Sequence, residues 1–211
     1  MDSVIIRNAS KKDLEGIMDV ELDWPEEQRA GSDKFVARLD KCPQGFFVAE
    51  VDGKIVGTST SCVIRYDPFH PEVHKSWDIV TNDGYIHRYE EIENPNALYI
   101  VSIGIKRNYR AKGIFQGFAK AQVDLAIKVG LPYVLAGAIM PGYDSYCKKY
   151  GDITAEEYGF TRIGHRLADP FLEVWRGLDF HVPDNRHIMT DYYSDTRSRN
   201  YSALVVYEIK K

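Results

Sequence analysis

Residues 97–130 constrain the fold more than any other part of this 211-residue chain. They open with an apolar run from Ala97 to Ile105, in which Val101, Ile103 and Ile105 alternate with small residues. This alternation is typical of a strand that is half or fully buried. A short basic segment with one glycine follows, and apolar residues then recur at helical spacing. The sequence therefore predicts a strand that runs through a basic turn into a helix.

The basic turn has the chemistry of an anion site. A helix start presents backbone N–H groups without intrahelical partners, and the helix dipole adds partial positive charge there. Gly113 lacks a side chain where a ligand would approach the backbone, and Arg110 and Lys112 add positive charge beside it. Such a site suits a phosphate. From spacing alone, an ordinary solvated basic turn remains an equally good interpretation.

The segment from Arg110 to Phe115, Arg-Ala-Lys-Gly-Ile-Phe, resembles the R/Q-x-x-G-x-G/A signature of the GNAT superfamily of N-acetyltransferases. The resemblance implies acetyl-CoA as co-substrate, a turn that holds its pyrophosphate, and a preceding strand whose backbone polarises the thioester. Phe115 departs from the Gly or Ala that the signature usually has, and its side chain must point away from the pyrophosphate. The implied cofactor-binding residues are Ile103, Gly104, Ile105, Arg110, Ala111, Lys112, Gly113, Ile114, Phe115 and Gln116.

The elements before this motif follow the GNAT order. We expect strands at residues 3–7, 44–51 and 54–62, the last two joined by an Asp52-Gly53 hairpin turn. Helices are expected after Ser10, with Asp13 completing a capping-box-like start, and from Ser32. The implied fold is α/β, with a mixed, mostly antiparallel central sheet that contains a splayed strand pair and has helices on both faces.

The part of the chain after the motif continues the match. Residues 132–138 are expected to form a buried strand, and 180–183 and 203–209 the closing strands. A capping box at Thr154 and Glu157 predicts a helix to about residue 165. Asp169, followed by Pro170, predicts the start of another helix.

Residues 66–95 exceed what a minimal GNAT domain needs and are rich in aromatic and charged side chains. We therefore expect one domain over residues 1–211 with an insertion at about 66–95. Because long loops in compact domains often carry function, we expect the insertion to form a wall of the acceptor site. The alternative is a decoration that merely packs on the sheet edge.

Composition excludes several classes of function. The chain is 44% hydrophobic and 27% charged, as in soluble globular proteins, and its formal charge of −4 does not favour nucleic-acid binding. It shows no membrane-spanning run and no signal peptide. Three widely spaced cysteines, Cys42, Cys62 and Cys147, are expected to be reduced thiols in a cytoplasmic protein.

Several further elements resemble one GNAT subgroup, the acetyltransferase-like domain found fused to carbon–nitrogen hydrolases in some bacterial proteins. The sequence contains no hydrolase segment, so we expect no such activity from it. Asp179-Phe180 departs from the Gly-Phe usual in that subgroup. The shared elements are Trp77-Asp78-x-x-Thr81-x-Asp83-Gly84, Leu98-Tyr99, Pro141-Gly142-Tyr143, Glu157-Tyr158, Asp169-Pro170-x-Leu172 and Tyr192-x-x-Asp195-x-x-Ser198.

Acetyl transfer to an amine needs a group that takes the amine proton and a group that protonates the leaving thiolate. Many GNAT enzymes use a tyrosine as the general acid. By resemblance, the corresponding position in this chain is Trp175, and an indole cannot act as a general acid. Tyr143 is therefore the first candidate, because Pro141-Gly142 fixes its turn, and Tyr146 is the second. For each of them, a packed aromatic with a satisfied hydroxyl is the more common interpretation. Candidates for the base lie in the insertion: Asp78, Asp83, His87 and Glu91.

No metal site is expected. His70 and His74 have the spacing of a zinc-binding pair, but Pro71 interrupts the turn and no third ligand is evident. The predicted function is acetyl-CoA-dependent N-acetyl transfer to a small-molecule or peptide amine. The alternative is a catalytically silent CoA-binding regulatory module. The acceptor, the acyl length and the oligomeric state stay open, with a homodimer among the options.

Overall fold

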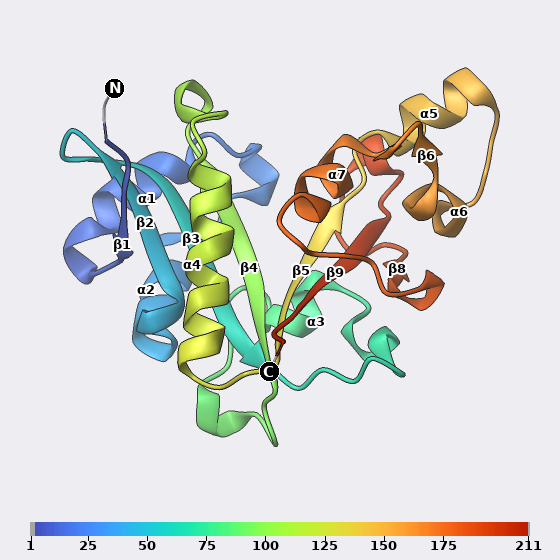
Figure 1. Ribbon diagram of the computed structural model, residues 1–211. Coiled ribbons are helices and arrows are strands. Elements are labelled where there is room, and N and C mark those ends of the chain that lie inside the picture. The colour runs from blue at the N-terminus through green and yellow to red at the C-terminus, as the bar shows by residue number, and fades with distance from the viewer. Residues whose placement is uncertain (1–2, 211) are drawn as a thin grey trace. The chain divides into compact units, whose positions relative to one another are not determined.

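The computed structural model describes residues 3–210, which form two compact units. The first unit combines the described residues up to Arg65 with Thr81–Val134, and the second combines Tyr66–Val80 with the residues from Leu135 onward. Figure 1 shows the course of the chain. The single domain expected from the sequence stays a prediction.

Within the described residues, the first unit contains the strands β1, β2, β3 and β4 in this spatial order. They are β1 (Ile5–Asn8), β2 (Phe46–Val51), β3 (Lys54–Ile64) and β4 (Ala97–Ile105). Every neighbouring pair is antiparallel. The predicted strands at the start of the chain, at the hairpin and before the basic turn are all present, although β3 extends two residues further than expected.

The β2–β3 hairpin has the turn that Asp52-Gly53 predicts. Both residues adopt positive φ angles, 49° at Asp52 and 75° at Gly53, as two-residue hairpins of this kind require. A β-bulge between Ala49 and Glu50 interrupts the register with β3. The turn chemistry was therefore readable from the sequence, while the bulge was not.

Helices cover both faces of this sheet. On one face, α1 (Leu14–Glu21) and α2 (Ser32–Lys41) pack their apolar side chains against β2. On the other face lies α4 (Ile114–Lys128), the long helix in front of the sheet in Figure 1. Because successive residues of a strand point to opposite faces, β2 contributes side chains to both cores. The first core includes Ile17, Phe35, Leu39, Phe46 and Val48, and the second includes Ala49, Val51, Val56, Ile114 and Phe118.

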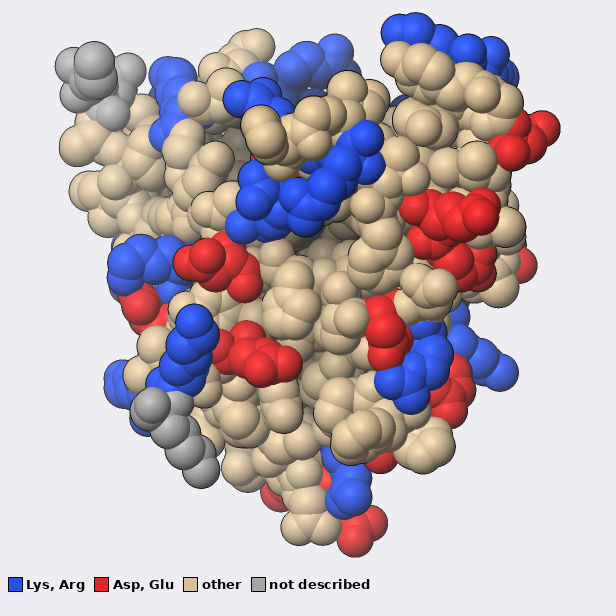
Figure 2. All heavy atoms as spheres, turned by 45° about the vertical axis from the view of Figure 1, so that its right-hand side comes forward, with Lys and Arg blue, Asp and Glu red and all other residues tan. Residues whose placement is uncertain are grey.

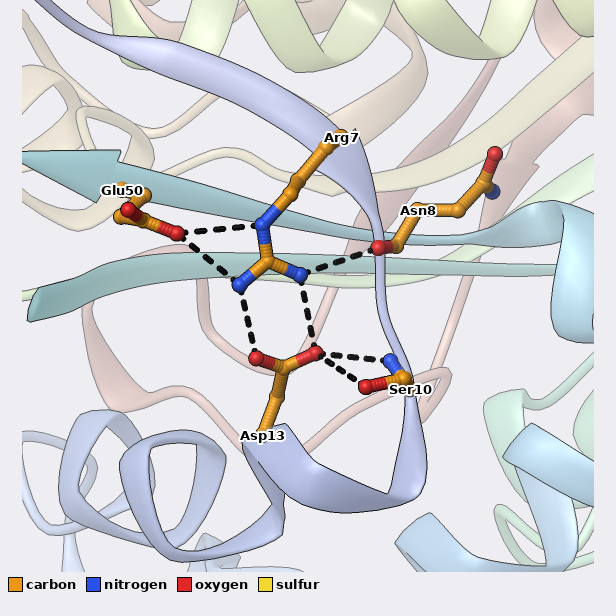
Figure 3. A network of polar contacts seen from close by, with 5 residues as sticks. All are labelled: Arg7, Asn8, Ser10, Asp13 and Glu50. Carbon is orange, nitrogen blue, oxygen red and sulfur yellow. Dashed lines mark hydrogen bonds and ion pairs between the residues drawn. The ribbon is translucent and has the colours of Figure 1, made fainter. Parts of the chain in front are cut away.

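A polar network holds the start of the chain against this sheet (Figure 3). The Arg7 guanidinium donates to both carboxylate oxygens of Asp13, at 2.9 and 2.7 Å, and to Glu50 at 3.0 and 2.9 Å. Asp13 also accepts from the Ser10 backbone N–H at 2.8 Å, as the predicted capping-box-like start requires. The network therefore joins β1, β2 and the turn that precedes α1.

The second unit has its own strands, in the order β5-β9-β8. These are β5 (Tyr133–Ile139), which begins at the end of the first unit, β8 (Ile188–Met189) and β9 (Ser202–Glu208). The predicted strands near residues 132–138 and 203–209 are thus confirmed. Residues 180–183 do not form a strand, because only an isolated bridge between His181 and Val206 is present there.

The described residues of the second unit include the helices α5 (Tyr143–Tyr150), α6 (Ala155–Phe160) and α7 (Pro170–Arg176). α6 begins with the predicted capping box, in which Glu157 N–H donates to Thr154 Oγ1 at 3.1 Å. It ends five residues earlier than expected. The chain after it forms the short hairpin β6 (Arg162–Ile163) and β7 (Arg166–Leu167), with Gly164 at a φ of 64°.

The insertion at residues 66–95 is divided between the units. Its first part belongs to the second unit, where the Tyr66 hydroxyl lies 2.8 Å from His187 Nε2 and Trp77 N–H donates to the Tyr192 carbonyl at 3.1 Å. Its second part, from Thr81, belongs to the first unit. The short helix α3 (Trp77–Thr81) contains the change from one unit to the other. The insertion is therefore ordered secondary structure and turns.

Candidate active site

The basic turn and α4 form the strand-turn-helix arrangement that the sequence predicts. Gly113 is the N-cap of α4 at a φ of 76°, a conformation that favours glycine, and no side chain caps the helix. The first helical bond runs from Gly117 N–H to the Gly113 carbonyl at 2.9 Å. The 15-residue α4 therefore begins at this turn and directs the positive end of its dipole at it.

The turn is also open and cationic. A side-chain carbon built onto Gly113 would meet nothing within 4 Å, so a ligand has room to approach the backbone. Arg110 and Lys112 are exposed. The Arg110 Nε–H donates to the Ile105 carbonyl at 3.3 Å, and Lys112 Nζ lies 4.9 Å from the centre of the Tyr109 ring. These features fit the pyrophosphate of a CoA thioester.

Apolar packing under β4 supports this turn. Ile103 and Ile105 pack into the core that contains Ile114 and Phe118 of α4. The contact is close, because a side chain on Gly57 would come within 3.0 Å of the Phe118 ring and 3.1 Å of the Gly104 carbonyl. The position of the helix start relative to β4 is thus set by a tight apolar contact.

The opposite face of β3 and β4 is polar where it meets α1 and α2. Thr58 pairs with Gly104 and Thr60 with Ser102 across the two strands, and the Thr60 and Ser102 hydroxyls lie 2.9 Å apart. A side chain on Gly104 would lie 3.1 Å from the Trp24 indole nitrogen. Glycine at this position therefore lets the chain between α1 and α2 approach the strand closely.

Arg38 reaches this polar face from α2 and is only 2% exposed. Its Nε–H donates to the Gly84 carbonyl at 2.7 Å, whereas its Nη1 lies 3.5 Å from both the Thr60 and Ser102 hydroxyls. Burial lowers the pKa of Arg38 to about 10, because a low-dielectric environment disfavours the charged form. A buried cation is thus held beside β4.

Glu21, at the end of α1, is the buried carboxyl of the same region. Its side chain accepts the Ala30 N–H at 2.7 Å, and the residue is 7% exposed. Burial raises the pKa of this carboxyl, and the positive charge of Arg38 opposes that shift. A carboxyl group with a raised pKa is suited to proton transfer near neutral pH.

The second part of the insertion is fixed to α2 around Arg38. Lys41 Nζ donates to the Ile86 carbonyl at 3.0 Å, and Lys34 pairs with Asp83 at 3.0 Å. Two further side-chain contacts, Asp33 with Tyr85 and Asp40 with Arg88, join the same segments. The insertion therefore forms one side of the polar region next to Arg38, although its role in acceptor choice stays a prediction.

The two tyrosines predicted from the sequence lie on α5 in the second unit. Tyr143 is 4% exposed, its hydroxyl donates to the Ile153 carbonyl at 2.7 Å, and burial raises its pKa. Tyr146 is half-buried, and its hydroxyl has no hydrogen bond within residues 3–210. Both rings pack on Tyr158, at centroid distances of 5.0 and 5.2 Å.

The bases predicted in the insertion lie at the surface. Asp78 is exposed on α3, and Asp83 is exposed and paired with Lys34. His87 Nδ1 lies 3.5 Å from Glu91 Oε2. The structure thus brings the predicted turn residues together, but it does not bring these four side chains into one buried cluster.

Arg38 and Glu21 were missed because the sequence reasoning assigned their helices to packing alone. The spacing of these residues did indicate burial. Arg38 follows the buried Phe35 by three residues, and Glu21 follows the buried Ile17 by four, so each lies on the apolar face of its helix. A charged side chain on the apolar face of a helix has to be buried, so it needs a specific partner.

The surface view in Figure 2 shows basic and acidic side chains interspersed with broad uncharged areas.

None of the helices formed by residues 3–210 is long and apolar enough to cross a lipid bilayer.

The model of the Acetyltransferase (GNAT) family matches residues 14–141 of this chain. The chain belongs to the GNAT acetyltransferase family. The matched range includes β4, the open turn and α4. This GNAT protein therefore belongs to an acyltransferase family that uses acetyl-CoA as co-substrate, as the resemblance in the sequence implied.

Two curated proteins of Bacillus subtilis (strain 168) resemble this GNAT protein over nearly its whole length. The "Probable hydrolase YhcX" is 30% identical over 207 residues, which are 96% of this chain and 38% of that protein. The "Uncharacterized N-acetyltransferase YkwB" is 25% identical over 212 residues, 97% of this chain and 88% of that protein. The chain thus spans about two-fifths of the first relative and most of the second.

Solved structures confirm the α/β GNAT fold. The loading GNATL domain of CurA from Lyngbya majuscula has a TM-score of 0.80 and 20% sequence identity, and the match covers 98% of each chain. The GphF GNAT-like decarboxylase in complex with isobutyryl-CoA has a TM-score of 0.79 and 19% identity, with 98% of this chain and 100% of that chain covered.

Proposed function

We propose that this GNAT protein is an acetyl-CoA-dependent N-acetyltransferase that acts on a small-molecule or peptide amine. The observation that carries the proposal is the open turn before α4. There Gly113 leaves free space, no side chain caps the helix, and Arg110 and Lys112 are exposed. The relative YkwB, which bears the name of an N-acetyltransferase, supports the same chemistry.

Acetyl-CoA supplies the acetyl thioester, and the chain's own groups would hold it in two places. The backbone of residues 103–105 is the proposed donor to the thioester carbonyl, because N–H groups aimed at a developing oxyanion stabilise it. Residues 110–116 would hold the pyrophosphate through backbone N–H groups and positive charge. The apolar contact of Ile103 and Ile105 with α4 keeps both places in one rigid element.

Removal of the amine proton needs a base near the polar face of β4, and a carboxylate can serve. Glu21 meets this requirement better than Asp78, because Glu21 is buried and burial raises its pKa. Asp78 is exposed on α3 and stays the alternative base. A carboxylate of raised pKa accepts a proton from an ammonium group with a smaller energetic penalty than an ordinary one.

Protonation of the leaving thiolate is the second proton step. A tyrosine is a suitable donor when its hydroxyl is free to point at the sulfur. Tyr143 already donates its hydroxyl proton to Ile153, whereas the Tyr146 hydroxyl has no hydrogen bond within the described residues. We therefore place Tyr146 first and Tyr143 second, the reverse of the order expected from the sequence.

The experiment is acetyl-CoA turnover with a panel of primary amines, followed by free thiol and by the mass of each product. Acetylated amine and CoA in equal amounts are the expected result. Tight CoA binding without acetylation of any amine would instead support the regulatory module. Failure to bind CoA would contradict both functions.

A second candidate function is decarboxylation of an acyl-CoA that carries a free carboxylate. It is favoured by Arg38, a buried cation beside β4, and by the likeness to the decarboxylase GphF. Conversion of malonyl-CoA and a proton to acetyl-CoA and carbon dioxide, without any amine, would support it. Unchanged malonyl-CoA after long incubation would contradict it.

A further inference from the structure

We propose that Arg38, Thr60 and Ser102 form a subsite that binds a carboxylate carried by the substrate. This inference rests on the proposed acyl-transfer function, because it names the chemical class of the molecule that enters the same site. The subsite lies wholly in the first unit, between α2 and the strands β3 and β4.

The first argument is the hydrogen bonding of Arg38. A guanidinium has five N–H donors, and buried polar groups are nearly always satisfied. Arg38 makes one short hydrogen bond, from Nε to the Gly84 carbonyl at 2.7 Å, and two contacts of 3.5 Å from Nη1. Its Nη2 has no hydrogen bond within residues 3–210. Most of its donor capacity therefore remains for a ligand.

The second argument is charge. Within residues 3–210, no carboxylate of the chain forms an ion pair with Arg38. The buried carboxyl of the same region, Glu21, interacts with Arg38 only electrostatically and accepts the Ala30 N–H at 2.7 Å instead. An unpaired buried charge is strongly unfavourable, and a carboxylate that meets a guanidinium edge-on makes two parallel charge-assisted hydrogen bonds. A bound carboxylate would neutralise Arg38.

The third argument is location. Thr60 of β3 and Ser102 of β4 are directly opposite each other in the sheet, and their hydroxyl oxygens lie 2.9 Å apart. Ser102 is only partly buried and immediately precedes Ile103, where the backbone is proposed to polarise the thioester. One residue of a strand spans about 3.3 Å. A carboxylate here would therefore lie next to the reacting carbonyl.

The guanidinium is also held in a fixed orientation. Gly84 fixes the Nε edge, and the plane lies over the Phe35 ring at 5.0 Å from its centre. Its Nη1 faces the two hydroxyls on the strands. Such pre-orientation reduces the conformational entropy lost when a ligand binds.

The carboxylate has two chemical sources. It can belong to the acceptor, which would then be an amino acid or another amine with an acid group. It can also belong to the acyl chain of a dicarboxylic acyl-CoA. Glu21, the buried carboxyl of the same region, favours the acceptor, because an amino acid offers an ammonium group to Glu21 and a carboxylate to Arg38.

The test measures binding to the full chain, so that it does not depend on turnover. In the first arm, the proteinogenic amino acids and their carboxamides are compared in the presence of CoA, by thermal shift and then by calorimetry. In the second arm, succinyl-CoA is compared with butyryl-CoA, which lacks the carboxylate. Preference for the acid in the first arm assigns the subsite to the acceptor, and preference in the second assigns it to the acyl chain.

Arg38→Met should reduce the affinity for the preferred acid about 10- to 100-fold and leave the affinity for its neutral partner unchanged, because bonds to a charged group are lost. Lys41→Met is the matched control. It removes another bond between α2 and the insertion, from Lys41 Nζ to the Ile86 carbonyl, without touching the subsite. Thr60→Val should weaken acid binding by a smaller factor.

Equal affinity for acid and neutral probes in both arms of the wild-type protein would overturn the subsite, whatever the variants do. Equal losses in Arg38→Met and Lys41→Met would also overturn it and assign Arg38 to holding the insertion. Acid preference without any acetylated amine would keep the subsite and contradict the N-acetyltransferase function. The two proposals can therefore fail separately.

Discussion

Two buried charged residues of this GNAT protein, one in each unit, differ in how fully they are hydrogen-bonded. Asp169 of the second unit is 1% exposed, and its two oxygens accept four hydrogen bonds, from Gly142, Phe171, Leu172 and Tyr158, at 2.9 to 3.2 Å. Arg38 of the first unit is 2% exposed and makes one short hydrogen bond.

The difference separates a structural charge from a binding charge. The bonds to Asp169 come from the start of α7 and from the turn before α5, so this carboxylate holds two helix ends in place. A carboxylate at an N-cap that is fully satisfied has no capacity left for a ligand. Arg38 keeps that capacity, and it lies beside the strand proposed to hold the thioester. The groups proposed to bind the substrate and the cofactor thus lie in the first unit.

The largest expected effect concerns the open turn of the first unit. Gly113→Glu should abolish CoA binding, because it adds bulk and a negative charge beside the pyrophosphate. Gly130→Glu is the matched control, since Gly130 also has a positive φ, 75°, and open space around it, but lies at the other end of α4. Calorimetry that gave both variants the same CoA affinity would exclude the turn as the pyrophosphate site.

The next effect compares the two buried charges directly. Asp169→Ala should lower the free energy of unfolding by about 3 kcal/mol, because several buried donors lose their acceptor. Arg38→Met should change it by less than about 1 kcal/mol, since it replaces a poorly satisfied charge by an apolar side chain of similar length. Urea titration of both variants measures the difference, and similar losses would remove the contrast between them.

Asp169 also predicts a pH dependence. Burial raises its pKa in the folded state, so the folded protein binds this proton more tightly than the unfolded chain does. The contribution of this group to stability is therefore fully present below the unfolded pKa and is lost as the pH rises through the raised one. Asp169→Asn should remove that part of the slope in a series of melting curves at different pH.

A third effect tests whether the second unit contributes to the chemistry. Tyr146→Phe should lower turnover about 100-fold, as loss of a general acid does, without changing CoA affinity. Tyr143→Phe should lose the hydrogen bond to Ile153 and hence stability, but retain more activity. Steady-state kinetics on the two variants decides the order. Full activity in Tyr146→Phe would leave Tyr143 or water as the donor.

The smallest effect concerns the network in Figure 3. Hydrogen bonds from Arg7 hold the pKa of Asp13 at about 2. Its stabilisation is therefore present above the ordinary Asp pKa and is lost as the pH falls towards 2. Asp13→Asn should lower stability by about 1 kcal/mol at neutral pH and remove this acid dependence. The exposed Glu15→Gln is the control, with an expected change below about 0.5 kcal/mol.

Local features of the molecule were readable from the sequence. The alternation of apolar residues predicted β4, the Asp52-Gly53 pair predicted the hairpin, and Thr154 with Glu157 predicted the start of α6. Each depends on interactions over a few residues, so the chain encodes it locally. The spacing around Gly113 likewise predicted the strand-turn-helix on which the cofactor assignment rests.

Other features depended on distant contacts. The end of α6 at Phe160 follows from the β6–β7 hairpin, and the hydroxyl of Tyr143 is engaged by Ile153, a carbonyl ten residues away. The division of the insertion between the two units likewise depends on the residues that each of its parts contacts. A local sequence pattern does not predict contacts between distant residues, because tertiary packing overrides secondary-structure propensity wherever it buries a side chain.

The sequence by itself determined the family, the order of the elements around β4 and the glycine-bearing basic turn before α4, since these rest on short-range pattern and glycine chemistry. Only the tertiary structure decided which charged groups are buried. Arg38 and Glu21 look like ordinary helix residues in the chain, and they become a cation and a carboxyl of the same polar region only when α1 and α2 pack on β3 and β4. Burial is a collective property of the packed elements, and it gives these two charges their chemistry.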